Sequence, residues 1–245
     1  MTSFLAEIRQ TIIPDPSRDG PLPPLLVTLT IVTGLVDAFS YLVLGHVFVA
    51  NMTGNVVFLG FALAGAQGFS IPASVVALGA FGIGALGGGR LGSAMSCRRG
   101  TLLAATAAVQ VVFLAAGVVM AALAGSPVPA GYRYGLIVAL AISMGVQNAT
   151  ARRLAVPDLT TTVLTLTIVG IAADSDMVGG GGSRAGRRLI SVTAMLAGAL
   201  VGAALVVHVQ IVYPLVIALV AVAIVAGTTR ALAASQPAWA TTGES

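Results

Sequence analysis

Long runs of apolar residues follow one another along almost the whole chain, separated by short polar breaks. Eight such segments can be delimited, at residues 25–44, 53–66, 71–93, 101–124, 133–150, 159–173, 189–209 and 211–229. Six of them have the length of about 20 residues that crosses roughly 30 Å of hydrocarbon. The segments do not alternate apolar and polar positions, as the strands of a membrane barrel do. The pattern therefore predicts an all-α membrane protein.

Composition agrees with a membrane location. Apolar residues make up 57% of the 245 residues and charged residues only 8%, whereas soluble domains carry about a quarter charged residues. The 12 basic residues are all arginines, and they lie in short loops and not along one face, which argues against nucleic-acid binding. The single cysteine, Cys97, excludes an internal disulfide and a cysteine metal cluster.

Two of the segments, 53–66 and 159–173, are too short to cross as the others do, since 14 or 15 helical residues span about 21–22 Å. If all eight segments cross, the arginines on either side of 159–173 fall on opposite faces of the membrane. If the two short segments enter and return to the same face, six helices cross and both termini are cytoplasmic. Arginine then collects on the cytoplasmic side, at Arg90, Arg98, Arg99, Arg152, Arg153, Arg184, Arg187, Arg188 and Arg230, with Arg133 as the exception. We therefore expect six transmembrane helices and two re-entrant half-helices.

A weak internal repeat agrees with this arrangement. Residues 34–38 (GLVDA) align with 145–149 (GVQNA), and a polar cluster that opens a short segment follows each, at 51–55 and at 160–162. Three spans in each half would insert the second half upside down, which is the inverted 3+3 repeat of many secondary transporters. We delimit a cytoplasmic segment at 1–24, membrane repeats at 25–124 and 125–232, and a cytoplasmic tail at 233–245.

Two stretches carry a family resemblance: TGLVDAFSYLVLGHVFVANMTGNVVFLG, from Thr33, and GVQNATARRLAVPDLTTTVLT, from Gly145. They resemble the YoaK family of bacterial inner-membrane proteins, which is catalogued as a domain of unknown function. The G-x-x-D-A and N-M-T-G-N blocks carry most of the likeness, which covers roughly 25–230. In the second half, Thr161 and Thr162 stand where a Thr-Gly pair is expected. The resemblance implies a multi-pass protein of the bacterial cytoplasmic membrane with about six spans, and it supplies no substrate.

Asp37 is the one acid well inside a predicted span. A carboxylate at that depth costs at least about 2.5 kcal/mol, so it must face protein or water. Thr33 and Tyr41 lie one helical turn before and after it, on the same face. Two interpretations remain open: a proton- or ion-coupling site, or a carboxylate that binds a neighbouring broken helix.

The polar clusters at the starts of the short segments are candidates for binding a small solute. A helix N-terminus carries roughly half a positive charge and attracts anions. Gln147 and Asn148 are the second-half counterparts of Val36 and Asp37. The expected binding residues are Asp37, Asn51, Thr53, Gly54, Asn55, Gln147, Asn148, Thr160, Thr161 and Thr162. Ordinary helix capping and bonds between helices are the alternative roles for these side chains.

Glycines at intervals of four residues predict close contacts between helices. They lie in the third and seventh segments, at Gly84, Gly88, Gly92, Gly198 and Gly202. This small-xxx-small spacing lets two helix backbones approach each other inside a membrane.

No motif of a hydrolase, a metalloenzyme or an ATP-binding domain is present. We therefore expect no enzymatic activity, no cofactor and no metal site. We interpret the chain as a secondary transporter or facilitator of a small solute, either an anion that moves with a proton or a neutral molecule. The alternative is a non-transporting membrane scaffold or partner subunit whose polar core is structural. The expected partners are membrane lipid and the solute, not nucleic acid, and assembly into a homo-oligomer stays open.

Overall fold

The structure is a computed structural model that describes residues 8–9, 11–13, 19–95, 98–157, 159, 169, 185–234 and 238–240. Over these residues the fold is helical and contains no strand. Six helices are long and apolar enough to cross a membrane: α2 (Leu22–Val43), α4 (Ile71–Ala94), α5 (Arg99–Ala124), α6 (Ala130–Leu154), α8 (Ala185–His208) and α9 (Tyr213–Ala233). The shorter α3 (Met52–Leu63) lies between α2 and α4, and a 3-10 helix, η2 (Ala238–Ala240), follows α9. The prediction of six long apolar helices is confirmed.

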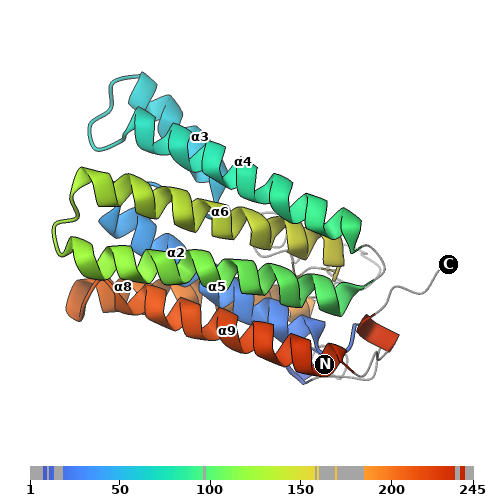
Figure 1. Ribbon diagram of the computed structural model, residues 1–245. Helices are drawn as coiled ribbons and strands as arrows, with labels where there is room; N and C mark the ends of the chain where they lie inside the picture. The colour runs from blue at the N-terminus through green and yellow to red at the C-terminus, as the bar shows by residue number, and fades with distance from the viewer. Residues whose placement is uncertain are drawn as a thin grey trace.

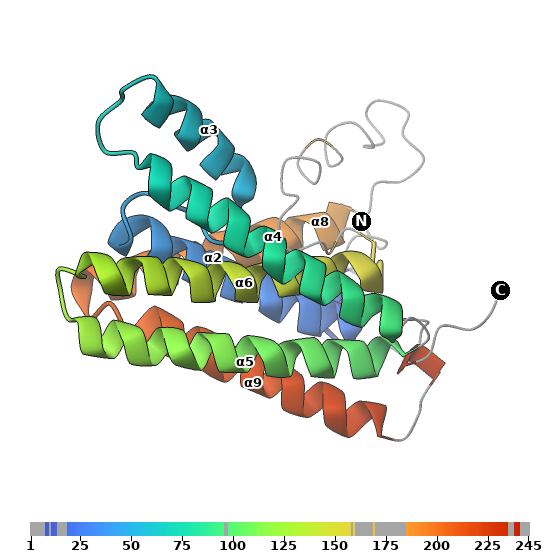
Figure 2. The same ribbon diagram turned by 45° about the horizontal axis from the view of Figure 1, so that its top comes forward.

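The six long helices run side by side, and α3 leans away from them over α4 (Figures 1 and 2). The two most enclosed helices are α2 and α6, in which 67% of the apolar window is buried, against 33% or less in the other four. The outer helices present apolar side chains to the surroundings, such as Leu86, Val112, Leu200 and Ile224, which are all at least 60% exposed. Hydrocarbon is as apolar as these side chains, so the outer surface suits contact with lipid.

Glycines bring α4 and α6 into backbone contact. A Cβ atom on Gly84 would lie 2.2 Å from the carbonyl oxygen of Ile142, and one on Gly88 would lie 2.9 Å from that of Val146. Real Cβ atoms do not approach so closely, so only glycine fits at Gly84 without a shift of the backbone. Residue numbers increase together along the two helices, which are therefore parallel.

Glycines join α2 and α8 in the same way. A Cβ atom on Gly198 would lie 2.2 Å from the carbonyl oxygen of Ile31, and one on Gly202 would lie 3.0 Å from that of Leu35. From the other side, Gly34 of α2 packs against the backbone of α8. This pair is also parallel. Two parallel crossings of the small-xxx-small kind thus hold α2 and α6 inside the bundle.

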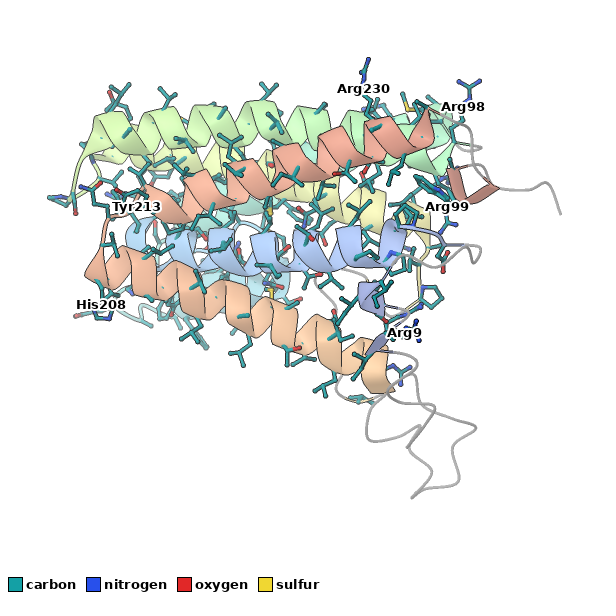
Figure 3. The ribbon with its side chains drawn as sticks, turned by 90° about the horizontal axis from the view of Figure 1, so that it is seen from below. Arg9, Arg98, Arg99, His208, Tyr213 and Arg230 are labelled. Atoms are coloured by element: carbon teal, nitrogen blue, oxygen red, sulfur yellow. The ribbon has the colours of Figure 1, made fainter. Side chains whose placement is uncertain are left out.

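Arginines gather at one end of the bundle. Figure 3 shows Arg9, Arg98, Arg99 and Arg230 at that end, whereas His208 and Tyr213 lie at the opposite end. Arg152 and Arg153 lie in the last turn of α6. Cationic side chains near a helix C-terminus interact favourably with the helix dipole.

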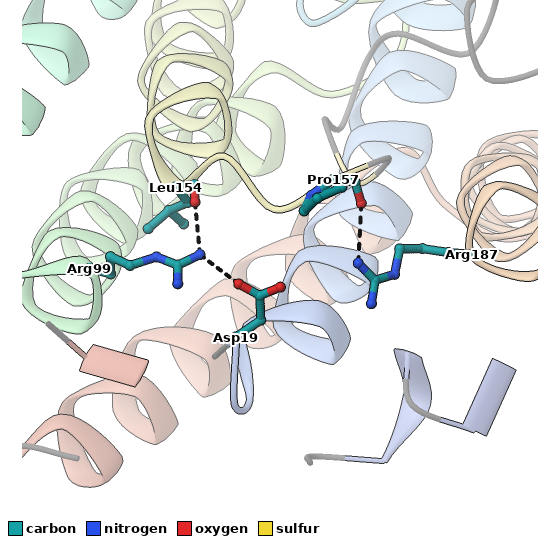
Figure 4. Close-up of polar contacts among 5 residues, drawn as sticks. All are labelled: Asp19, Arg99, Leu154, Pro157 and Arg187. Atoms are coloured by element: carbon teal, nitrogen blue, oxygen red, sulfur yellow. Dashed lines mark hydrogen bonds and ion pairs between the residues drawn. The ribbon is translucent and has the colours of Figure 1, made fainter. Parts of the chain in front are cut away.

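One of these arginines joins three helices (Figure 4). The Arg99 guanidinium, in the first turn of α5, donates to the Asp19 carboxylate at 2.9 Å and to the Leu154 carbonyl oxygen at 2.9 Å. Asp19 precedes α2 and Leu154 ends α6. Nearby, Arg187 of α8 donates to the carbonyl oxygen of Pro157 at 3.5 Å. These contacts fix the relative positions of the helix ends at this face.

Replacing Gly84 with alanine is expected to lower thermal stability in detergent by roughly 1–3 kcal/mol, the range for overpacking a core. The added methyl group would meet the Ile142 carbonyl oxygen at 2.2 Å. Gly82→Ala, two residues earlier on the same helix, is the matched control, because a Cβ there meets nothing within 4 Å. Alanine is the better helix former, so the control should unfold at the same temperature or higher. Equal transitions in the two variants would contradict a close α4–α6 contact.

Candidate functional site

After α2 the chain turns back and runs along the helix it has just left. Gly45 and His46 take positive φ angles of 91° and 56°, which reverse the chain direction. The returning segment then reaches Asp37, whose Oδ1 accepts hydrogen bonds from the backbone N–H groups of Val49 at 3.0 Å and Ala50 at 2.8 Å. A carboxylate inside α2 thus binds the non-helical backbone that precedes α3.

The second oxygen of Asp37 is bound by Asn51. Its Oδ2 accepts from the Asn51 backbone N–H at 3.2 Å and from the Asn51 side-chain amide. An ionised carboxylate has about four acceptor sites, so these donors together saturate Asp37, which is only 4% exposed. Asn51 is the N-cap residue of α3, but its side chain makes no cap bond there. Helix capping, the alternative role of Asn51, is not observed, because its side-chain amide donates to Asp37 instead.

The rest of the N-M-T-G-N block fixes the returning backbone at Phe48. The Asn55 side chain accepts from the Phe48 N–H at 2.9 Å and donates to the Phe48 carbonyl oxygen at 2.6 Å. Gly54 leaves room for the Phe48 ring, since a Cβ there would lie 2.7 Å from it. Asn55 is the buried residue of α3, whereas Thr53 is exposed. The block therefore has a structural role at three of its positions.

Aromatic rings hold the outer part of this region together. Tyr41 of α2 stacks on Phe48 with ring centroids 5.0 Å apart, and Phe58 of α3 stacks on Phe69 at 5.2 Å. His46 also contacts Tyr41, and its Nδ1 lies 3.0 Å from the carbonyl oxygen of Gly68. The turn after α2 and the turn after α3 therefore lie beside each other.

The helix α3 does not begin at the midpoint of α2. Its preceding backbone is bound to Asp37, about 9 Å from the end of α2 at about 1.5 Å per residue, whereas the midpoint of α2 is at Thr33. With 12 residues, α3 is about 18 Å long, well short of the hydrocarbon thickness. The start of this short helix thus lies beside the C-terminal third of α2.

Gln147 connects α6 to α2 in the centre of the bundle. It is fully buried, and its side-chain amide donates to the Leu29 carbonyl oxygen at 3.2 Å and to the Thr33 hydroxyl at 2.8 Å. Its carbonyl oxygen has no hydrogen-bond partner among the described residues. The adjacent Asn148 donates to the Met144 carbonyl oxygen of its own helix at 2.9 Å.

Two further buried polar residues were not singled out from the sequence. Gln110 of α5 and Ser143 of α6 are both fully buried, and neither side chain has a hydrogen-bond partner among the described residues. Ser143 lies one helical turn before Gln147, and Gln110 is the amide residue in the middle of a long apolar segment. The isolation of Gln110 in that segment was the available signal, but a single amide in a helix does not reveal what it faces.

A hollow opens at the arginine-rich end, between α4 and α6. Its volume is about 930 Å³, and Arg90, Arg152 and Arg153 line it together with Ser93, Leu86 and three glycine or alanine residues. Gly92, the third predicted packing glycine of α4, packs against the Arg153 side chain and not against a backbone. Among the described residues that line the hollow there is no carboxylate.

The second predicted cluster cannot be placed in the same way. Thr160, Thr161 and Thr162 lie outside the described residues, as does most of the short segment 159–173. The structure brings Asp37 into contact with Asn51. Gly54 and Asn55 contact the returning chain at Phe48. Gln147 lies deeper in the bundle, next to Thr33, one turn from Asp37 along α2.

Comparison with known proteins identifies sequences similar to this chain. The family model described as "Protein of unknown function (DUF1275)" matches residues 25–228. The UPF0700 transmembrane protein YoaK of Bacillus subtilis (strain 168) is 35% identical over 154 residues, which cover 61% of this chain and 65% of that protein. No solved structure matches the chain.

Replacing Asn55 with leucine, which has a similar shape and no polar atoms, should release the returning chain at Phe48. Both bonds from Asn55 to the Phe48 backbone are lost, and the partly buried N–H and carbonyl groups of Phe48 lose these partners, at about 1 kcal/mol each. Faster hydrogen exchange at Phe48 and Val49 is the expected result. Thr53→Val, on the exposed side of the same helix, should leave exchange unchanged. Equal exchange in both variants would show that Asn55 does not hold this segment.

Proposed function

The chain belongs to the family described as "Protein of unknown function (DUF1275)", and we propose that it is a transporter or facilitator that moves a small solute across the bacterial cytoplasmic membrane. One observation carries the proposal: a short helix is preceded by a chain reversal whose non-helical backbone is bound inside the bundle by Asp37. Non-helical backbone at membrane depth occurs where it is buried in protein or lines a cavity. Broken helices of this kind form the binding sites of many secondary transporters.

In this proposal α3 is a re-entrant half-helix, and the two halves of the chain form an inverted repeat. Support comes from the two parallel glycine crossings. If α2 corresponds to α6 and α4 to α8, exchanging the halves converts the α2–α8 pair into the α6–α4 pair. Gly34 then corresponds to Gly145, and both pack against the backbone of their partner helix. The glycine pairs of α4 and α8 correspond in the same way.

The orientation follows from charge. The arginine-rich end would face the cytoplasm, and both termini would lie on that side. The turns after α2 and α3 would then face the outside. The arginine-lined hollow would open to the cytoplasm, where its three guanidinium groups would attract anions.

If Asp37 couples transport to protons, its protonation must change the hydrogen bonds that its carboxylate accepts from residues 49–51. Its four donors occupy both oxygens, so a proton that binds must displace a donor. Protonation would thereby loosen residues 49–51 and the start of α3. A small anion that moves with a proton fits this behaviour and the arginine-lined hollow. A neutral solute is the second form of the proposal, and the uncharged side chains of Gln147 and Asn148 support it.

The alternative function is a membrane scaffold or partner subunit. The saturation of Asp37 favours it, because a carboxylate with all acceptor sites used can serve purely to fold the chain. In that case Asp37, Asn51 and Asn55 hold the short helix and do nothing further. Stability and flux measured on the same variants separate the two functions.

Asp37→Asn in proteoliposomes tests the coupling. Asparagine cannot take up a proton as the carboxylate does, so proton-coupled flux should fall roughly tenfold or more, whereas the loss of hydrogen bonds to a charged group, worth about 1.5–3 kcal/mol, would appear as a lower unfolding temperature. Formate, acetate and phosphate serve as anion probes and urea and glycerol as neutral probes, with a trapped pH dye reporting protons. Ser40→Ala is the control, since Ser40 is also buried on α2 and its hydroxyl donates to the backbone carbonyl oxygen of Asp37 and not to the carboxylate.

Three outcomes decide between the functions. Loss of proton-coupled flux in a variant that still unfolds near the wild-type temperature supports coupling at Asp37. Loss of folding with unchanged flux per folded molecule supports a structural carboxylate. If no probe crosses faster than in empty liposomes with the wild-type protein, the transport proposal fails.

Cysteine labelling tests the re-entrant path. In a Cys97→Ser background, Gln67→Cys and His208→Cys should react with an impermeant thiol reagent from the same side of the membrane. Arg98→Cys should react from the other side, because it lies at the opposite end of the bundle from His208 (Figure 3). If Gln67→Cys reacts together with Arg98→Cys, α3 crosses the membrane and does not return.

A further inference from the structure

A layer of uncharged polar side chains crosses the middle of the bundle, apart from the Asp37 region. We propose that Gln110, Ser143 and Gln147, the central polar cluster, form the point at which a small hydrogen-bonding solute is held on its way through the protein. Gln110 and Ser143 lie within about two residues, or about 3 Å, of the midpoints of α5 and α6. Thr33, which orients Gln147, lies at the midpoint of α2.

The register of α5 against α6 places these side chains at one level. A Cβ atom on Gly117 would lie 3.1 Å from the Leu140 side chain, and the two helices run in opposite directions. Seven residues are close to two helical turns, so two residues that are seven apart lie on the same face of their helix. That step leads from Gly117 to Gln110 on α5 and from Leu140 to Gln147 on α6. Gln110 is therefore brought to the level of Gln147.

The free energy of these groups argues against a purely structural role. A buried polar group without a partner destabilises a protein by about 1–3 kcal/mol. Four side-chain atoms of the cluster are buried and have no hydrogen-bond partner among the described residues: the amide nitrogen and oxygen of Gln110, the hydroxyl oxygen of Ser143 and the carbonyl oxygen of Gln147. Leucine and alanine would fill the same positions without that penalty. A bound molecule that supplies the missing hydrogen bonds accounts for the choice of residues.

The geometry also defines the chemistry of that molecule. Gln147 is held by its bonds to Thr33 and Leu29, so its carbonyl oxygen is a fixed acceptor. Gln110 can donate and accept, and the Ser143 hydroxyl can do both. The cluster has no charge, and Asp37, one helical turn from Thr33 on α2, is saturated by its own donors. The ligand is therefore small, has both donors and acceptors, and carries no positive charge.

This inference rests on the proposed transport function and names the residues that contact the solute. Measuring whether water-soluble reagents reach the central polar cluster tests it, even though the solute is not identified. In a Cys97→Ser background, the thiol of Ser143→Cys is exposed to two water-soluble reagents, aminoethyl and sulfonatoethyl methanethiosulfonate. Ala141→Cys is the matched control, because Ala141 is fully buried on the same helix. It lies one turn before Gly145, which packs on the α4 backbone.

Because cysteine reactivity follows exposure, Ser143→Cys should react about tenfold or more faster than Ala141→Cys. Equal, very slow reaction of both variants would overturn the proposal, since the cluster would then be a dry contact. If Ser143→Cys reacts quickly but the wild-type protein moves none of the flux probes, the cluster is a hydrated ligand site and the transport function fails. If flux is seen without reaction, the solute takes another path.

Gln110→Leu gives a second, independent test. Leucine removes two unpartnered polar atoms at nearly constant volume, so the thermal transition should stay the same or rise, while Ser143→Cys in the same chain should react about tenfold more slowly. A lower transition temperature with unchanged thiol reactivity would assign Gln110 to folding alone and contradict a solute site.

Discussion

The carboxylate of Asp37 and the backbone N–H groups of residues 49–51 form the contact on which the first half of the molecule depends. Hydrocarbon offers no hydrogen-bond partner to a backbone that leaves the helix. One acid inside α2 supplies acceptors for three consecutive N–H groups and for the amide of Asn51. The position of Asp37 along α2 therefore sets how far the chain returns and where α3 begins. Gly54, Asn55 and the ring of Phe48 then complete the same segment.

A second constraint acts on the whole bundle. The glycine contacts of α2 with α8 and of α4 with α6 require the backbones to touch, and this encloses α2 and α6 on several sides. Enclosure has a chemical consequence, because the polar residues of these two helices must then face protein. Gln147 therefore donates a hydrogen bond to Thr33, and Ser143 is buried inside the protein. The small residues that pack the helices thus also create the uncharged polar centre.

Much of the architecture could be predicted because it depends on local quantities. The length of an apolar segment is compared directly with the thickness of hydrocarbon, so six long helices and a short segment at 53–66 follow from residue counts. The depth of Asp37 inside an apolar run likewise predicts that protein must surround it. Glycine spacing predicts close approach, and four of the five predicted glycines lie at such backbone contacts, at Gly84, Gly88, Gly198 and Gly202. None of these inferences needs knowledge of which helices are neighbours.

The sequence by itself determined that the chain is a multi-pass helical protein with an acid, amides and glycines inside its apolar segments. Only the tertiary structure decided what those side chains bind. Asn51 has the residue type of a helix cap, yet it donates to Asp37, because the returning chain brings the two together. Gln110 and Ser143 are ordinary polar residues in the sequence, but the packing of α5 and α6 leaves their side chains without a hydrogen-bond partner among the described residues. Hydrogen-bond partners depend on the register between helices far apart in sequence, and no local pattern contains that register.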